Sequence, residues 1–213
     1  MRVAALYDVH AMPWALEAVL ADVADEGVDA VVFGGDLDWG PYPDETLELV
    51  RSVDGAHFVR GNCDRESEVH WLQELPMTVA LDGVLYCHST PTDDMPIVTA
   101  ETPVEALDEL FAEAVEDTVV IGHTHHQFDR RATRVRIVNA GSVGMPYEGE
   151  VAAFWAVIED GEPRFRKTSF DVERAIDAVG SSEWPQAADF VAENLQVAAS
   201  REEAIASLED RRS

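Results

Sequence analysis

The sequence contains the stretch Ile121-Gly122-His123-Thr124-His125-His126, which follows directly on the apolar residues 118–120. The apolar run predicts a buried strand, so the histidines stand where that strand opens into a loop. Two imidazoles at positions i and i+2 of an extended chain share one face, where they can bind one metal ion or two neighbouring ions. A histidine-rich surface loop would contain the same residues. The choice depends on whether other metal-binding side chains stand at equivalent positions along the chain.

Four other apolar runs also end on side chains that can bind metal. Residues 2–7 lead to Asp8 and His10, residues 30–33 to Asp36, residues 56–59 to Asn62, and residues 83–87 to His88. Helical patterns over about 13–27, 44–52, 66–74 and 103–111 separate the runs, an alternation typical of a parallel sheet with right-handed crossovers. Ligands bind outside the carboxyl ends of parallel strands, so one fold would bring all seven side chains together.

The later part of the chain has a different pattern. Short strands are predicted at about 127–132, 134–138, 151–158 and 164–170, and their turns indicate antiparallel pairing that forms or extends a second sheet. Residues 171–213 are predicted to be helical, with a capping box from Ser200 to Glu203. We expect an α/β domain over residues 1–170 and a helical extension, 171–213, packed on the same domain through its apolar stripe. A partner-binding helix is the alternative for this extension.

The predicted ligands supply oxygen and nitrogen and no required thiolate: Asp8, His10, Asp36, Asn62, His88, His123 and His125. Such a set suits Mn²⁺, Fe, Zn²⁺ and similar ions, and it argues against iron–sulfur clusters. Seven ligands exceed what one tetrahedral ion uses, so two ions are implied, with one carboxylate bridging them. Two metals about 3.5–4 Å apart can hold a bridging hydroxide as nucleophile, and the chemistry that this serves best is phosphoester hydrolysis.

The same residues resemble a known family. The ordered segments Asp8-Val9-His10, Gly35-Asp36, Gly61-Asn62-Cys63-Asp64, His88 and Gly122-His123-Thr124-His125 are similar to the motifs of the calcineurin-like metallophosphoesterase superfamily. Residues 139–144 and Gly40-Pro41 further resemble its small bacterial and archaeal phosphoesterase and phosphodiesterase branch. The resemblance covers roughly residues 1–170. It implies an α/β fold in which two mixed β-sheets pack as a sandwich flanked by helices.

The resemblance also implies a ligand set and a reaction. Asp8, His10, Asp36 and His125 would hold the first ion, and Asp36, Asn62, His88 and His123 the second. Mn²⁺ is the first expectation, with Fe, Zn²⁺, Ni²⁺ or Co²⁺ as alternatives. Asp36 and Asn62 would then serve catalysis on a small phosphate mono- or diester. The superfamily also contains non-catalytic scaffolds, such as the retromer scaffold subunit, so a catalytically weak metal-binding scaffold or regulatory protein stays open.

One position departs from the family pattern. Many members have His after the motif Asn, placed to assist the leaving group, and this chain has Cys63. A thiol with a pKa of about 8.5 in peptides donates a proton less readily than an imidazolium with a pKa of about 6.5. We therefore expect slow or narrow activity on esters with poor leaving groups, or a metal-bound water as the acid. Cys63 as a small residue in a tight turn is the alternative, and Asp64 is expected to orient a neighbouring group.

Three further residues are candidates for substrate binding. Arg60 and Arg65 flank the Asn62 segment, and a guanidinium matches phosphate with two hydrogen bonds. Arginines in such positions also pair with nearby Asp or Glu, which is the alternative here. His126 could line the pocket.

Charge limits the classes of partner. The chain has 213 residues, with 42 Asp and Glu against 15 Lys and Arg, a net charge of −27, and Lys167 as its one lysine. This charge repels nucleic-acid phosphates and anionic membranes, so it disfavours generic nucleic-acid binding, a DNA-processing nuclease and a membrane partner. Acidic residues spread along the whole chain indicate a salt-adapted protein.

The sequence also gives an expectation about location. No apolar run approaches the roughly 18 residues of a membrane helix, and the first ten residues do not resemble a signal peptide. Two cysteines, Cys63 and Cys87, fit a reducing compartment. We expect a cytoplasmic protein, and homo-oligomerisation stays open.

Overall fold

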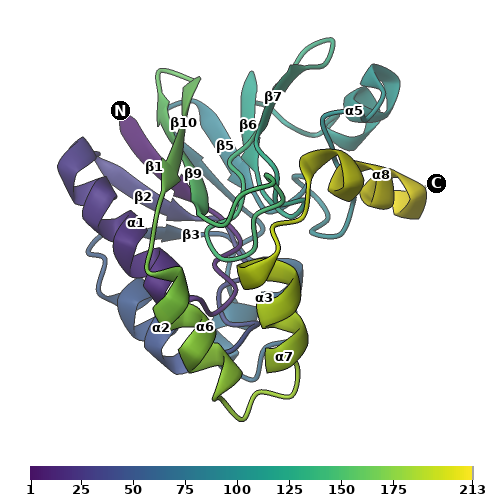
Figure 1. Ribbon diagram of the computed structural model, residues 1–213. Helices are drawn as coiled ribbons and strands as arrows, with labels where there is room; N and C mark the ends of the chain where they lie inside the picture. The colour runs from purple at the N-terminus through teal and green to yellow at the C-terminus, as the bar shows by residue number, and fades with distance from the viewer. Residues whose placement is uncertain (213) are drawn as a thin grey trace.

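Two five-stranded β-sheets lie face to face in the computed structural model, which describes residues 1–212 (Figure 1). The first sheet has the order β10 (Glu162–Thr168), β9 (Ala153–Glu159), β1 (Arg2–Leu6), β2 (Ala30–Phe33) and β3 (His57–Phe58). The second has the order β4 (Thr78–Leu81), β5 (Val84–Cys87), β6 (Thr118–Ile121), β8 (Arg136–Asn139) and β7 (Phe128–Arg131). Both sheets are mixed, because β1–β2–β3 and β5–β6–β8 are parallel and the remaining pairs are antiparallel.

The apolar run at the start of the chain forms a strand that is buried on both faces. Val3, Ala5 and Tyr7 belong to the core between the two sheets, whereas Ala4 and Leu6 belong to the core beneath the helices. This split follows from the two-residue period of a strand. It explains why the segment is almost continuously apolar and does not alternate with polar residues.

Helices cover the outer face of each sheet. The first sheet carries α1 (Pro13–Glu26), α2 (Pro43–Arg51), α6 (Val172–Gly180), α7 (Ala187–Phe190) and the π-helical η1 (Val191–Gln196), while α5 (Val104–Leu110) covers the second. Two short helices, α3 (Asn62–Arg65) and α4 (His70–Gln73), follow β3. Pro13 begins α1, and Gly27 ends it in the left-handed conformation, as the sequence predicted.

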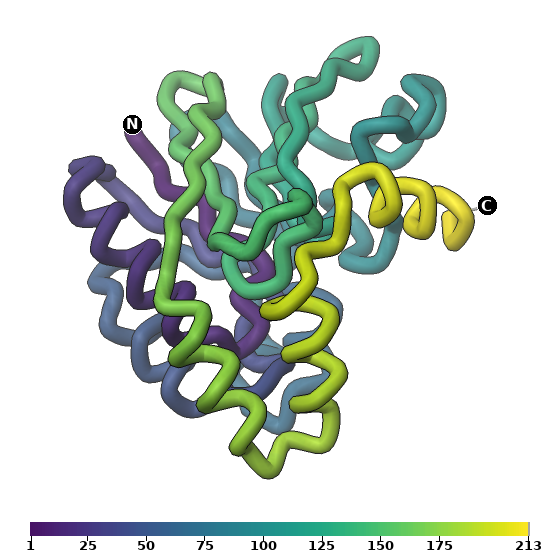
Figure 2. Tube along the Cα trace, in the orientation of Figure 1, coloured from purple at the N-terminus to yellow at the C-terminus, as the bar shows by residue number. Residues whose placement is uncertain are grey.

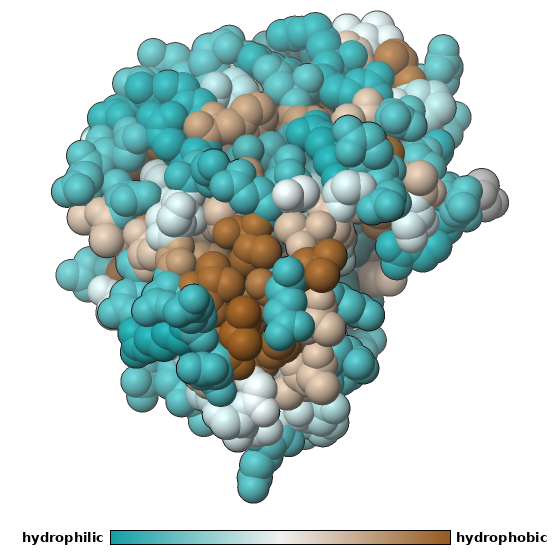
Figure 3. Space-filling model, in the orientation of Figure 1, coloured by the Kyte–Doolittle hydropathy of each residue, from teal (hydrophilic) through white to brown (hydrophobic). Residues whose placement is uncertain are grey.

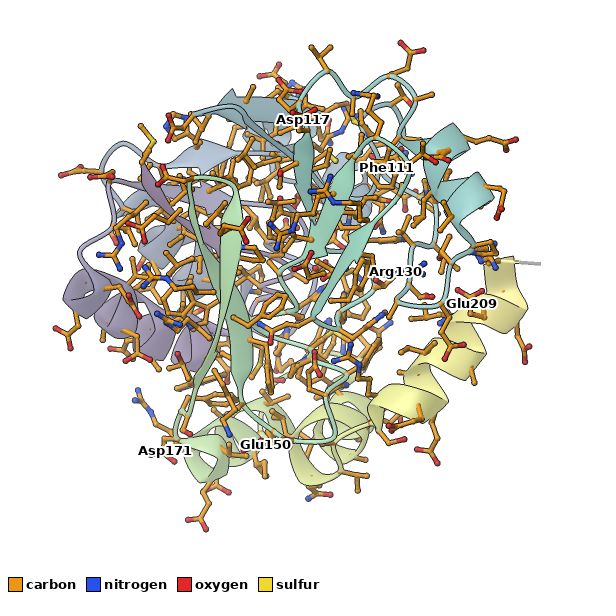
Figure 4. The ribbon with its side chains drawn as sticks, turned by 90° about the horizontal axis from the view of Figure 1, so that it is seen from above. Phe111, Asp117, Arg130, Glu150, Asp171 and Glu209 are labelled. Carbon is orange, nitrogen blue, oxygen red and sulfur yellow. The ribbon has the colours of Figure 1, made fainter. Side chains whose placement is uncertain are left out.

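The last helix, α8 (Arg201–Arg212), lies apart from α6 and α7, on the side of the molecule that carries α5, as the Cα tube shows (Figure 2). The Ser200 side chain and the Glu203 backbone form the predicted cap. Glu209 accepts a hydrogen bond of 2.5 Å from the Thr99 hydroxyl. On the same side, Arg130 donates to the carbonyls of residues 100 and 102 at 2.6 and 2.7 Å (Figure 4). The extension thus packs on the first sheet through α6, α7 and η1 and reaches the loop before α5 through α8.

Several predicted elements were wrong. Strands β9 and β10 extend the first sheet, not the second, because β9 is buried along most of its length and pairs with β1. Strand β8 pairs with β6 in parallel, where an antiparallel partner was expected, and β4 was missed. The helix predicted over 66–74 is interrupted, because the Ser67 hydroxyl accepts from the Val69 amide and so competes with the helical pattern.

The visible surface is mostly hydrophilic, and Figure 3 shows one apolar area on it, near the C-terminal helices. Over residues 1–212, no helix has both the length and the apolar character needed to cross a membrane.

Candidate metal centre

The loops after β1, β2, β5 and β6 converge at the carboxyl ends of both sheets. They carry the buried side chains of Asp8, His10, Asp36, His88 and His125. Ligand atoms of Asp8, His10 and His125 lie within 4.8 Å of one another, and so do those of Asp8, Asp36 and His88. Asp8 therefore belongs to two groups of potential metal ligands.

The backbone of these loops is unusual. Five of the predicted ligands have left-handed φ angles: Asp8 (52°), His10 (49°), Asp36 (54°), His123 (66°) and His125 (56°). Such conformations cost on the order of 1 kcal/mol or more for a residue with a side chain, and they gather at functional sites. The prediction that His123 and His125 share one face of extended chain was wrong, because β6 already ends at Ile121.

Glycines allow the carboxylates to approach the backbone. A Cβ atom at Gly122 would collide with Asp8, and one at Gly61 would collide with Asp36. The close approach to the backbone at Gly122 is therefore made by an aspartate of the site itself.

Each aspartate has one oxygen fixed by a backbone amide. Oδ2 of Asp8 accepts from the His123 amide at 2.8 Å, and Oδ1 of Asp36 accepts from the Cys63 amide at 2.8 Å. Oδ1 of Asp8 is buried and has no hydrogen-bond partner. A buried carboxylate oxygen without a partner is costly, and a bound cation would remove that cost.

The other aspartate oxygens face the same pair of imidazoles. Oδ1 of Asp8 and Oδ2 of Asp36 each lie 3.9 Å from Nε2 of His10. Nε2 of His88 lies 3.9 Å from the first oxygen and 3.6 Å from the second. Asp36, the predicted bridging residue, thus lies between these two histidines, and Asp8 does so as well but lies closer to a third, because its Oδ1 is 3.3 Å from Nε2 of His125.

Backbone carbonyls orient all four histidines of the predicted ligand set. The pairs are His10 Nδ1 with Trp39 O (3.2 Å), His88 Nδ1 with Gly34 O (2.8 Å), His123 Nε2 with Met95 O (3.1 Å) and His125 Nδ1 with Met145 O (2.8 Å). A carbonyl accepts only, so the nitrogen next to it carries the proton. In the neutral ring the second nitrogen then has a lone pair, which is the form that binds a metal.

Two short contacts in the centre then join acceptor to acceptor. Nε2 of His10 lies 3.1 Å from Nε2 of His125, and Nε2 of His88 lies 3.0 Å from Oδ1 of Asn62. Two lone pairs at such distances repel unless a proton or a cation lies between them. The donor set of oxygen and imidazole nitrogen suits divalent ions, so these residues fit a metal.

Burial keeps two of the imidazoles neutral. Desolvation, reinforced by neighbouring His125, lowers the pKa of His10 to about 4. Desolvation and His88 lower the pKa of His123 to about 4. Burial opposes ionisation of Asp8, but His125, His88 and His10 together lower its pKa below the ordinary value. At neutral pH the centre thus offers neutral imidazoles at His10 and His123 and an ionised Asp8, whereas the charges of Asp36 and Asp8 outweigh burial and raise the pKa of His88.

Asp64 holds two loops and does not face the centre. Its buried carboxylate accepts from the amides of Asp36 (2.8 Å), Leu37 (2.9 Å) and Gly61 (2.7 Å). Burial and the charge of Asp36 raise the pKa of Asp64, while the backbone hydrogen bonds oppose that shift. The orienting role expected for Asp64 fits this geometry.

Cys63 and the two arginines lie beside the centre. Burial, followed by the charge of Asp36, raises the pKa of the Cys63 thiol well above its ordinary value. Arg65 donates to Oδ1 of buried Asp94 at 2.8 Å, and Nε of Arg60 lies 3.8 Å from Oδ2 of Asp94. Both arginines thus pair with an acidic residue, which is the alternative that the sequence left open.

His126 is packed into the fold. It is fully buried, its Nδ1 lies 2.9 Å from the Thr124 carbonyl, and its Nε2 accepts from the Ala100 amide at 3.3 Å. Both ring nitrogens are therefore occupied. This is a structural position and not the substrate contact that the sequence suggested.

A cleft of about 990 Å³ opens next to the centre. Asn62 and Cys63 line it on the side of the metal ligands, and Arg65, Met95 and the Trp39 segment form further parts of its wall. The loop 89–96 contributes Met95 to this cleft. A substrate in this cleft would contact Asn62, the one predicted ligand among the residues that line it.

Comparison with known proteins decides the family. The sequence matches the calcineurin-like phosphoesterase superfamily domain over residues 1–160. The chain belongs to this superfamily. Calcineurin-like phosphoesterases are metal-dependent, and the two ligand groups around Asp8 are the candidate metal ligands of this one.

Solved structures confirm the fold of this phosphoesterase domain. A metallophosphoesterase from Sphaerobacter thermophilus has a TM-score of 0.72 and 22% identity, covering 87% of this chain and 95% of that one. The zinc complex of Vps29 from Entamoeba histolytica has a TM-score of 0.53 and 20% identity, covering 80% of this chain and 100% of that one. The predicted sandwich of two mixed sheets with flanking helices is therefore confirmed.

One curated relative is a DNA repair protein. The DNA double-strand break repair protein Mre11 of Halobacterium salinarum is 36% identical over 103 residues, which is 44% of this chain and 24% of that protein. The likeness therefore concerns part of the phosphoesterase domain only.

Sequence reasoning missed the residues that hold the candidate metal ligands in place. Asn139 donates to the Gly122 carbonyl at 2.6 Å and to the Thr124 hydroxyl at 3.0 Å, which fixes the histidine loop from β8. The Ser142 hydroxyl donates to the Asp8 carbonyl at 2.8 Å. Both lie in the 139–144 segment that resembled the family, which was the one available signal.

Proposed function

We propose that this chain is a phosphohydrolase that uses two divalent metal ions to hydrolyse a small phosphate mono- or diester. The observation that carries the proposal is the pair of acceptor-to-acceptor contacts, His10 with His125 and His88 with Asn62, on either side of the two aspartates. Asp8, His10, Asp36 and His125 would hold one ion, and Asp36, Asn62, His88 and His123 the other, with Asp8 near both groups. Mn²⁺ is the first choice.

The metals and the protein would contribute different things. When bound, two divalent ions would lower the pKa of a water that serves as nucleophile and would stabilise negative charge on the phosphoryl oxygens. The amides of His123 and Cys63 fix one oxygen of each aspartate, and the backbone carbonyls fix the histidine tautomers. The protein thus supplies a set of ligands that is oriented before substrate arrives.

Cys63 sets a limit on the substrate. Its thiol lines the cleft beside Asn62, and its raised pKa keeps it protonated and makes it a weak proton donor at neutral pH. An ester with a good leaving group needs little protonation as it departs. The proposed enzyme therefore favours such esters over alkyl phosphates.

The test uses metal-stripped full-length protein. It is reloaded with Mn²⁺, Fe²⁺, Zn²⁺, Ni²⁺ or Co²⁺ at low and high salt and assayed on monoesters, diesters, cyclic nucleotides, dinucleoside polyphosphates and phosphopeptides. We expect two bound ions per chain and turnover with at least one metal. Single- and double-stranded DNA are included because of the partial likeness to Mre11, and the net charge of −27 leads us to expect no cleavage of either.

Matched variants separate the metal site from general effects of charge. Asp36→Asn removes a carboxylate between His10 and His88 and should reduce metal stoichiometry and lower kcat about 100-fold or more. Asp54→Asn changes an exposed residue and should match the parent. Two-ion binding without turnover of any ester would instead support the catalytically weak scaffold that the sequence left open. The observation that favours this alternative is Cys63, which stands where many family members have a His that assists the leaving group.

A further inference from the structure

The cleft beside the metal ligands has an aromatic wall that comes from two distant parts of the chain. Trp39 follows β2, and Trp184 belongs to the segment between α6 and α7 in the C-terminal extension. Their rings meet edge to face with centroids 5.6 Å apart and an interplanar angle of 86°. Trp184 also packs edge to face on Phe190 at 5.4 Å, so the second ring is held from behind.

This wall adjoins the proposed reaction centre. The Trp39 ring lies edge to face on His10 with centroids 5.6 Å apart, and the Trp39 carbonyl accepts from the same imidazole. Asn62 and Cys63 line the cleft on the side of the ligands. A group that extends from a phosphorus bound at the centre would therefore enter a cleft walled by indole rings.

Trp39 is exposed to an extent unusual for its size. Its exposed fraction is 41%, although it lies beside a largely buried site. Met95, 50% exposed, lines the same cleft, and Pro185 adds a further apolar surface. Exposed aromatic and apolar groups that line one concave surface are typical of a ligand-binding cleft.

The charged residues of the cleft limit what the wall can accept. Asp38, Glu66 and Glu68 line it, and the one basic side chain among its lining residues, Arg65, is paired with Asp94. The net charge is therefore negative away from the metal ligands. A substrate group that carries a further phosphate or carboxylate would be repelled there, whereas a neutral or cationic ring would not.

We infer that the Trp39–Trp184 wall selects phosphoesters whose organic group is a flat aromatic ring without negative charge of its own. This inference rests on the proposed function, because the metal centre would hold the phosphoryl group. It adds a role for the C-terminal extension, which supplies Trp184. Aromatic stacking tolerates many ring systems, so the wall selects a class of substrate and not a single compound.

The test measures binding, so that leaving-group reactivity does not enter. Methylphosphonate and phenylphosphonate share the charged group and differ in the ring. Calorimetric titration of the Mn²⁺-loaded protein should show that phenylphosphonate binds roughly tenfold more tightly than methylphosphonate, or better. 4-Carboxyphenylphosphonate should bind more weakly than phenylphosphonate, and the double variant Glu66→Gln/Glu68→Gln should narrow that difference.

Variants assign the preference to the wall. Trp184→Ala should reduce the ratio of the affinity for phenylphosphonate to that for methylphosphonate roughly tenfold. Trp184→Phe should keep most of this ratio, because it keeps an aromatic ring. Trp39→Ala and Trp39→Phe provide an independent pair if Trp184→Ala does not fold. Phe165→Ala removes a ring that is 38% exposed on β10, outside the cleft, and should leave the ratio unchanged.

The possible failures are distinguishable. Equal affinity of the parent for the two phosphonates, or an unchanged ratio in both alanine variants, would overturn the aromatic selection and leave the metal-dependent reaction standing. Binding of neither phosphonate by the Mn²⁺-loaded protein would overturn the proposed phosphoester site and this inference with it.

Discussion

The backbone amide of Cys63 donates a 2.8 Å hydrogen bond to Oδ1 of Asp36. This single contact turns Oδ2 of Asp36 toward His10 and His88. Residue 63 therefore acts on the centre in two ways, through an amide that any residue other than proline can supply and through a side chain that faces the cleft. A substitution there can change the side-chain chemistry and keep the amide.

Replacement of Cys63 by His is expected to speed hydrolysis of alkyl phosphoesters. The imidazolium is a better proton donor than the protonated thiol, and a general acid contributes about 100-fold or more where the leaving group needs one. The gain for a 4-nitrophenyl ester should be small. The measurement is kcat/KM for both ester types in the parent, Cys63→His and Cys63→Ser; no gain of the His variant on the alkyl ester would refute the role given to residue 63.

Removal of the Asn139 side chain should loosen the histidine loop. Asn139→Ala leaves the buried Gly141 amide without its partner and removes one of the two donors to the buried Gly122 carbonyl, which keeps the Thr124 amide, so we expect a loss of about 1–3 kcal/mol in the free energy of unfolding. Metal affinity should fall as well, because His123 and His125 lie in this loop. Urea denaturation and metal titration measure the two effects, and a variant with parental values of both would show that the loop holds its own shape.

His126 makes stability dependent on pH. Burial lowers its pKa to about 4 in the folded protein, against about 6.5 in the unfolded chain. The neutral imidazole is thus favoured by folding, so its contribution is fully present above about pH 6.5 and is lost as the pH falls toward 4.

The parent should therefore lose more free energy of unfolding between about pH 6.5 and about pH 4 than the His126→Gln variant does. The difference between the two losses should be about 2–3 kcal/mol. The experiment compares urea denaturation of the parent and the variant across this range in metal-free buffer. Parallel curves would contradict the assignment, whatever their separation.

The acidic surface should make the protein more stable in salt. With a net charge of −27, repulsion between carboxylates opposes folding, and the screening length falls from about 10 Å at 0.1 M to about 3 Å at 1 M salt. We expect the Tm to rise by several degrees as the KCl concentration is raised across this range. Sucrose at equal osmolality is the control, since it acts by exclusion and not by screening; an equal rise in sucrose would remove the electrostatic explanation.

Sequence reasoning brought together the candidate metal ligands because each one follows an apolar strand. Asp8, Asp36 and His88 stand at recurring positions after such runs, and the chain topology alone brings those positions together. The same reasoning placed β9 and β10 in the wrong sheet. The hairpin turn at Asp160-Gly161 is local and was recognised, but the pairing of β9 with β1 spans most of the chain and leaves no local signal.

The orienting contacts were beyond the reach of the sequence for a related reason. The Met95 and Met145 carbonyls hold His123 and His125, yet a carbonyl belongs to every residue and marks none. Arg60 and Arg65 were recognisable as charged neighbours of Asn62. Their partner Asp94 lies about thirty positions further on, in a loop whose path no periodicity describes.

Met95 has a consequence for how the protein would respond to its ligands. Its backbone carbonyl fixes the tautomer of His123, while the residue also lines the cleft. A substrate that shifts Met95 would alter a metal ligand, and a metal that tightens His123 would alter the cleft. Because binding free energies are reciprocal, metal and substrate would change each other's affinity by the same factor. Metal occupancy would then be a regulated quantity, set in part by the supply of substrate.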